Sequence, residues 1–166
     1  IKFVSEYNVY TDSERKFSGI GIQLVSDGSN PAYQNRFSDC NCSDLYIGIL
    51  IEDSSTNGIN GNYFDVDLWN CSYFVKCNGN GNYFNGNQQA PVKIKGEKNC
   101  CFYITGNYNI FDGFVWDVGA FNDSSTNAAP LAYVTGRNND FRMPFLYNDA
   151  VAPFSAYASN KFCRLC

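Results

Sequence analysis

The segment from Tyr63 to Trp69 carries the residues of this chain that could do chemistry at a defined spacing. Asp65 and Asp67 are two positions apart, so in a β-strand their side chains lie on the same face. Two carboxylates about 5 to 9 Å apart are what a glycoside hydrolase uses to cleave a glycosidic bond. This spacing therefore makes a carboxylate glycosidase one hypothesis, although any exposed strand face can carry Asp-x-Asp.

Other catalytic chemistry is limited by what the chain lacks. It contains no histidine, which excludes Ser-His-Asp and Cys-His catalysis and every histidine metal site. Its cysteines are expected to be used in disulfides. We therefore expect a protein that is not an enzyme.

Binding is the function that this composition favours. Aromatic side chains stand beside Asn-rich turns, and such rings can receive the apolar face of a ligand while amides and carboxylates hydrogen-bond its polar rim. Sugars have both features, and so do protein surfaces. The alternative is that these rings are ordinary cross-strand pairs. The candidate binding residues are Tyr63, Asp65, Asp67, Trp69, Tyr83, Tyr108 and Trp116.

Calcium is an alternative ligand for some of the same oxygen-bearing side chains. Hard cations bind carboxylate and amide oxygens, and no complete calcium-loop motif is present. We predict no metal site and no cofactor, with calcium as the one alternative. The side chains concerned are Asp53, Asn60, Asn62, Asp65 and Asp67.

The eight cysteines form an even set, which predicts four disulfides and an oxidising, extracellular location. Zinc is the competing use, because Cys163 and Cys166 have a metal-knuckle spacing. A second such pair is missing, so disulfides are favoured. The set comprises Cys40, Cys42, Cys71, Cys77, Cys100, Cys101, Cys163 and Cys166.

Three glycosylation sequons support the same location, at Asn41, Asn70 and Asn122. An Asn-rich chain also produces such triplets by chance. The protein is expected to be secreted or displayed on a cell or virion surface.

The chain length limits the number of domains, and its charge and apolar runs limit the kinds of partner. The 166 residues suit one domain spanning residues 1–166. A net charge of −4, without clusters of Lys and Arg, argues against nucleic acid. The longest apolar runs are far shorter than the roughly 20 residues that span a bilayer, so membrane insertion is not expected.

The expected fold is all-β. Asn-Gly pairs supply the positive φ of tight hairpin turns, and residues 57–89 place two Asn-Gly clusters around an alternating strand. The run Leu45–Ile51 is nearly continuous in apolar residues, as in a strand buried on both faces. These patterns predict a disulfide-stapled antiparallel β-sandwich, with a jelly roll or a barrel as the alternative.

Short repeats occur along the chain. Residues 53–57 recur as residues 123–127, and Gly-Asn-Tyr begins at Gly61, Gly81 and Gly106. The flanking residues do not align, which favours similar turn chemistry over duplication of a half-domain.

The segment Cys101–Phe111 resembles hairpins of viral spike lectin-like domains, a resemblance that implies attachment to a host surface. The first hypothesis is therefore a secreted, glycosylated domain that recognises a glycan or a protein receptor. The second is a structural subunit of an extracellular assembly, since strands with few charges associate edge to edge. The glycosidase is the third.

Overall fold

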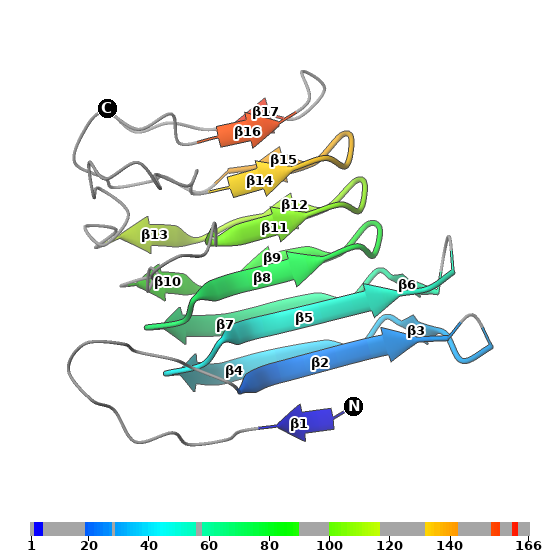
Figure 1. Cartoon of the computed structure of the whole chain (residues 1–166), viewed down its shortest axis with the longest axis horizontal. Helices are drawn as coiled ribbons and strands as arrows, with labels where there is room; N and C mark the ends of the chain where they lie inside the picture. The colour runs from blue at the N-terminus through cyan, green and yellow to red at the C-terminus, as the bar shows by residue number, and fades with distance from the viewer. Residues whose placement is uncertain are drawn as a thin grey trace.

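The computed structural model describes residues 2–4, 19–27, 29–55, 58–89, 100–116, 132–142, 154–156 and 161–162. Within these ranges the chain forms strands and no helix. The strands form a parallel β-solenoid, in which the chain passes from one sheet to a second and back again, so that its strands stack in two layers (Figure 1).

The first layer is sheet A, whose strands follow one another in sequence order. They are β1 (Lys2–Val4), β2 (Ile20–Ser26), β5 (Ile47–Asp53), β8 (Tyr73–Cys77), β11 (Phe102–Ile104), β14 (Ala132–Val134) and β16 (Phe154–Ala156).

The second layer is sheet C. Its strands are β4 (Arg36–Ser43), β7 (Tyr63–Trp69), β9 (Tyr83–Asn85), β10 (Asn87–Gln89), β12 (Ile110–Phe111), β13 (Phe114–Trp116), β15 (Asp140–Phe141) and β17 (Lys161–Phe162). A short third sheet pairs β3 (Ala32–Tyr33) with β6 (Ile59–Asn60).

Strand pairing corrects the predicted fold. Every pair in the described part of the chain is parallel except β1 with β2. The antiparallel β-sandwich is therefore wrong, and so are its jelly-roll and barrel alternatives. The Asn-Gly clusters were expected to fold hairpins, but they turn the chain from sheet A into sheet C. Consecutive strands consequently lie in different sheets, and each strand pairs with one from the neighbouring turn of the solenoid.

A corner of five residues makes this change of sheet three times, at residues 78–82, 105–109 and 135–139. Its fourth residue has a left-handed backbone, with φ of +64° at Gly81, +59° at Tyr108 and +55° at Asn138. A positive φ turns the chain sharply and is costly for residues other than glycine. Two corners therefore carry backbone strain that a glycine at the same position would relieve.

The fifth residue of each corner is a buried asparagine in a ladder that runs through the solenoid. Both the backbone N–H and the side-chain Nδ2 of each asparagine donate to Oδ1 of the next. From Asn62 to Asn82 the two distances are 3.1 and 2.9 Å. The ladder pairs the polar groups of the corner away from water, where an unpaired group is costly. Its members are Asn35, Asn62, Asn82, Asn109 and Asn139.

A phenylalanine ladder lies two residues further on and fills the space between the sheets. Adjacent rings stack with centroids 4.3–5.0 Å apart. Each stacked pair contributes about 0.5–1.5 kcal/mol of stability beyond that from burying the rings. Aliphatic side chains such as Ile49 and Ile51 face these rings from sheet A and are equally buried. The ladder consists of Phe37, Phe64, Phe84, Phe111 and Phe141.

Glycine is required at the second corner position. A Cβ on Gly106 would lie 1.9 Å from the carbonyl oxygen of Gly79, and one on Gly136 would lie 1.7 Å from that of Gly106. Backbones of successive turns therefore approach more closely here than any side chain allows.

The predicted disulfide framework is also wrong, since none of the six described cysteines forms a disulfide. Three of them, Cys71, Cys77 and Cys101, belong to the hydrophobic core, and the partly buried Cys40 and Cys42 pack against it. The inference of secretion consequently loses its main structural support. The described cysteines are Cys40, Cys42, Cys71, Cys77, Cys100 and Cys101, whereas Cys163 and Cys166 lie outside the described residues.

Other sequence expectations have mixed outcomes. The run Leu45–Ile51 contains most of β5, in which residues 47–51 are buried, as predicted. The segment Cys101–Phe111 is not a hairpin, because its strands β11 and β12 belong to different sheets. Residues 123–127 of the internal repeat lie outside the described part.

Candidate binding surface

The outer face of sheet C carries five of the seven predicted binding residues, four of them on β7 and Tyr83 on β9. Along β7, Phe64, Val66 and Leu68 point into the core, as the alternation predicts. The intervening residues face outward, with Tyr63 and Asp65 half-buried and Asp67 and Trp69 exposed. A strand that is apolar on one side and polar on the other thus presents these four side chains on one surface.

The two tyrosine rings of this face stack on each other. The rings of Tyr63 and Tyr83 stack with centroids 5.2 Å apart, and the Arg36 guanidinium covers the ring of Tyr63 at 4.6 Å. The Tyr83 hydroxyl donates to Asp112 at 2.9 Å. Burial and this carboxylate raise the pKa of Tyr83. These two rings stabilise the sheet and offer mainly their edges to a ligand.

The two carboxylates are each bound by the next turn of the solenoid. The Asn85 amide donates to Asp65 at 3.1 Å, and the Asn87 backbone N–H donates to Asp67 at 2.7 Å. A glycosidase encloses its acid in an environment that keeps it protonated, whereas Asp67 is exposed on the face of a sheet. The geometry thus suits hydrogen bonding to a ligand better than acid catalysis.

Trp69 differs from the tyrosines because its indole ring is exposed to solvent. It is 52% exposed, and among the described residues no aromatic ring stacks on it. In register beside it lie Ser43 on β4 and Gln89 on β10. Trp69 can therefore receive the apolar face of a ligand.

Exposed polar and aromatic groups continue around Trp69. Asn41 is the register partner of Asp67 on β4, and Phe114 is that of Asn87 on β13 and is 44% exposed. Together they form one surface across four neighbouring strands about 4.8 Å apart. The Trp69 patch, as we call it, consists of Asn41, Asp67, Trp69, Asn87, Gln89 and Phe114.

The remaining predicted binding residues lie at two different places. The backbone of Trp116 is in register with Gln89, so parallel pairing brings the two tryptophan positions onto one line. Tyr108, in contrast, is in a corner, 64% exposed, and its backbone N–H donates to Arg137. Tyr108 does not belong to the face of sheet C.

The residues proposed for calcium are not brought together. The Asp53 carboxylate accepts backbone N–H groups from Ser55 and Ile59, both at 2.9 Å, and Asn62 belongs to the asparagine ladder. Asp65 and Asp67 face outward from sheet C. The described residues contain no group of three or more His, Cys, Asp or Glu side chains that could hold a metal ion.

The buried cysteines are poor nucleophiles, since burial raises the pKa of Cys71 and of Cys77 to about 12. A thiol reacts through its thiolate, so both are inert at neutral pH. Of the glycosylation candidates, Asn41 is exposed on β4, while Asn70 sits in a turn followed by the buried Cys71 and Ser72. Asn122 lies outside the described part.

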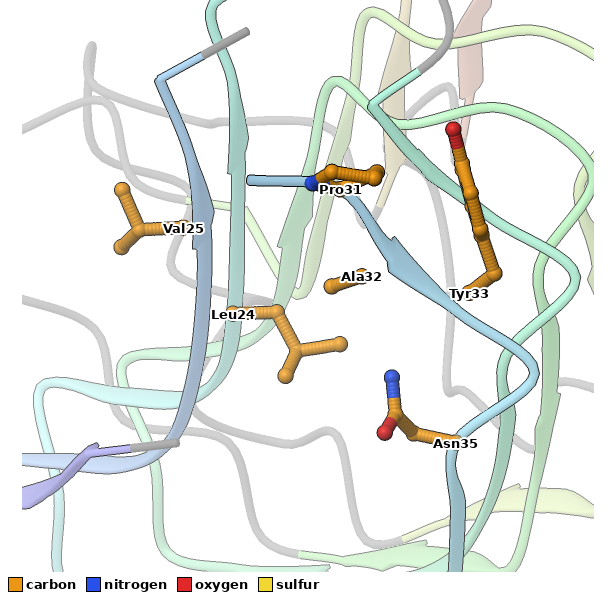
Figure 2. Close-up of a pocket in the computed structure, with 6 residues that line it drawn as sticks. All are labelled: Leu24, Val25, Pro31, Ala32, Tyr33 and Asn35. Carbon is orange, nitrogen blue, oxygen red and sulfur yellow. The ribbon is translucent and has the colours of Figure 1, made fainter. Parts of the chain in front are cut away.

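A pocket of about 320 Å³ lies beside β2 and β3. Figure 2 shows Leu24 of β2 directed toward Ala32, with the Asn35 amide below and Tyr33 on the far side. Val25 points away from them (Figure 2). None of the lining residues is charged or a nucleophile, so the pocket offers no catalytic constellation.

The sequence alone did not identify Asn87, Gln89 or Phe114 as binding candidates. They join the surface only because β10 and β13 pair in parallel with β7.

No protein family, no curated protein and no solved structure matches the chain. In the described part, none of the elements is a helix of the length and apolar character needed to cross a bilayer.

Proposed function

We propose that this protein is a non-catalytic binding module that recognises an uncharged glycan through the Trp69 patch. The observation that carries the proposal is the half-exposed ring of Trp69, on which no aromatic ring of the described residues stacks, beside a carboxylate and three amides in fixed register. A sugar ring can pack its C–H face on an indole while its hydroxyls bond to amide and carboxylate oxygens. The solenoid fixes the spacing of these groups before the ligand arrives, which lowers the entropic cost of binding.

Charge favours an uncharged ligand. Asp67 is the single charged side chain of the patch, and the chain as a whole carries a net charge of −4. A polyanion would be repelled by both. An extracellular location remains part of the proposal, because surface glycans are met there.

The test is affinity electrophoresis through gels that contain soluble uncharged polysaccharides, namely dextran, mannan, xyloglucan and a mixed-linkage β-glucan. The wild type is expected to be retarded by at least one of them. Trp69→Ala should weaken that interaction at least tenfold, because an aromatic anchor at the centre of a site commonly contributes 2 kcal/mol or more. Trp69→Phe should restore part of the binding.

Tyr108→Ala is the matched control, since it removes an even more exposed aromatic side chain that lies outside the patch. It should bind as the wild type does. Retardation by none of the polysaccharides, or equal retardation of the wild type and Trp69→Ala, would refute the proposal. Protein recognition on the same patch would then be the remaining use of these residues.

Assembly is a second candidate function, favoured by one edge of sheet C. Among the described strands, β4 pairs only with β7, whereas the corresponding edge of β2 in sheet A is covered by β1. An open edge is a template for another strand. Sedimentation velocity tests this idea: a monomer at all concentrations up to about 100 µM would exclude it, while Arg36→Pro on β4 should abolish any polymer.

A further inference from the structure

A second aromatic surface lies on the opposite side of the solenoid, on the outer face of sheet A. Lys76, Tyr103 and Tyr133 occupy one register line across β8, β11 and β14. The two tyrosine rings stack with centroids 5.2 Å apart, and they are 38% and 37% exposed. The Lys76 patch, as we call it, consists of Tyr73, Lys76, Tyr103 and Tyr133.

The lysine is held in place by rings on two strands. Its Nζ lies 4.8 Å from the ring centroid of Tyr73 and 5.7 Å from that of Tyr103. Attraction between a cation and the negative faces of these rings fixes the long side chain. The ammonium group is therefore preorganised, and the entropy of ordering it is lost on folding instead of on binding.

The charge of Lys76 is not neutralised by the described part of the protein. No carboxylate there lies within ion-pair distance of it, although the chain is acidic overall. Glu52, which faces outward on the neighbouring strand β5, accepts a hydrogen bond from Gln23 at 2.8 Å. A ligand that supplies one negative group would complete the patch.

Backbone recognition is not available on this face. Each of β8, β11 and β14 is paired with a neighbouring strand on both sides, so a peptide cannot add as a further strand. A ligand must be recognised by tyrosine hydroxyls, ring edges and one ammonium group. Hydroxyl groups around a single carboxylate match this set, whereas a dense polyanion would be opposed by the net negative charge.

We infer that the Lys76 patch is a second binding site, separate from the Trp69 patch, for an oligosaccharide that carries a single carboxylate. The carboxylate pairs with Lys76, and the sugar hydroxyls bond to the hydroxyl groups of Tyr103 and Tyr133. The two patches lie on opposite sheets, so each can be tested without disturbing the other.

The experiment is a glycan array of matched oligosaccharides that differ in one acidic sugar, with 3′-sialyllactose and lactose as one pair. The wild type should bind at least one acidic member more tightly than its uncharged match. Lys76→Met keeps the apolar stem and removes the charge, and it should weaken this binding about tenfold. Raising NaCl should weaken the wild type but not the residual binding of Lys76→Met.

Two control variants test whether binding of the acidic sugar depends on the Lys76 patch. Arg142→Met removes one positive charge on the other sheet, where Arg142 pairs with Asp140 at 2.9 Å, and it should bind the acidic sugar as the wild type does. Trp69→Ala should also leave this binding unchanged, which separates this site from the proposed function. Equal binding of acidic and uncharged members, or wild-type binding by Lys76→Met with an unchanged melting curve, would overturn the inference.

Discussion

Asn82 donates two hydrogen bonds to one atom of Asn109, from its backbone N–H at 2.9 Å and from its side-chain Nδ2 at 3.3 Å, both to Oδ1. Asn109 repeats the same geometry with Asn139. The polar groups of one corner are thus satisfied by the side chain of the next, and the stability of each turn depends on its neighbour.

Removing one member of this ladder should be costly. In Asn109→Ala, two donors of Asn82 lose their acceptor in a buried site, and each unsatisfied group costs about 1–3 kcal/mol. We expect a loss of about 2–5 kcal/mol in the free energy of unfolding, measured by urea denaturation. Asn87→Ala replaces an exposed asparagine and should change it by less than about 0.5 kcal/mol. Equal effects of the two substitutions would contradict the ladder.

The strained corner at Tyr108 predicts a stabilising substitution. Tyr108 has a φ of +59°, and Gly81 holds the same corner position with a φ of +64°. Tyr108→Gly removes the steric cost of this conformation, and its exposed ring has little burial to lose. The expected gain is about 0.5–1 kcal/mol after the larger entropy of the unfolded glycine chain is deducted, measured as a higher thermal midpoint. A lower midpoint would show that the ring contributes packing here.

The glycines predict a contrast between the second and the fourth position of the corner. Gly106→Ala would place a Cβ 1.9 Å from the Gly79 carbonyl oxygen, so successive turns must separate and the protein should unfold or lose at least about 3 kcal/mol. Gly81→Ala meets no atom within 4 Å and has only the positive φ to oppose it, which costs about 1 kcal/mol. Circular dichroism melts of both variants measure the difference, and similar midpoints would refute the close approach.

The buried thiols predict instability in alkali. Burial raises the pKa of Cys71 and Cys77 to about 12 from an ordinary value of 9.0. Above pH 9 the unfolded thiols lose their protons while the native ones keep them, so their contribution is complete below pH 9 and falls as pH rises toward 12. In this range the free energy of unfolding falls by about 1.4 kcal/mol per pH unit for each thiol. Urea denaturation at pH 8 and pH 10, under reducing conditions, measures it, and Cys77→Ala should reduce the pH dependence.

The local pattern of β7 was predictable, whereas its partners were not. Alternation identified Tyr63–Trp69 as a strand with one buried face, and the structure confirms it. Hydrophobic alternation says which face is buried but not which strand pairs with it. The Trp69 patch depends on pairing with residues about 20 positions or more away, which is why Gln89 and Phe114 were missed.

The repeat that defines the solenoid was present in the sequence but concealed. Asn-x-Phe begins at every ladder asparagine, at intervals of 27, 20, 27 and 30 residues. The similarity of Gly-Asn-Tyr at Gly61, Gly81 and Gly106 suggested a different alignment. In the third copy the motif falls two positions earlier in the corner, because Tyr108 and not glycine holds the left-handed position. Asn-Gly pairs suit such a corner as well as a hairpin, so turn residues alone could not separate the two folds.

The two sides of the solenoid place different limits on how its sequence can change. On the ladder side, the connection is five residues long in three successive turns. From sheet C back to sheet A, the number of residues between consecutive described strands rises from 3 (β7 to β8) to 12 (β10 to β11) and 15 (β13 to β14), while the ladders keep their register. Chain length can therefore be added along one edge at a small entropic cost. This protein is consequently a natural framework for grafting: new recognition loops can be inserted along that edge while the asparagine corners keep the turns aligned.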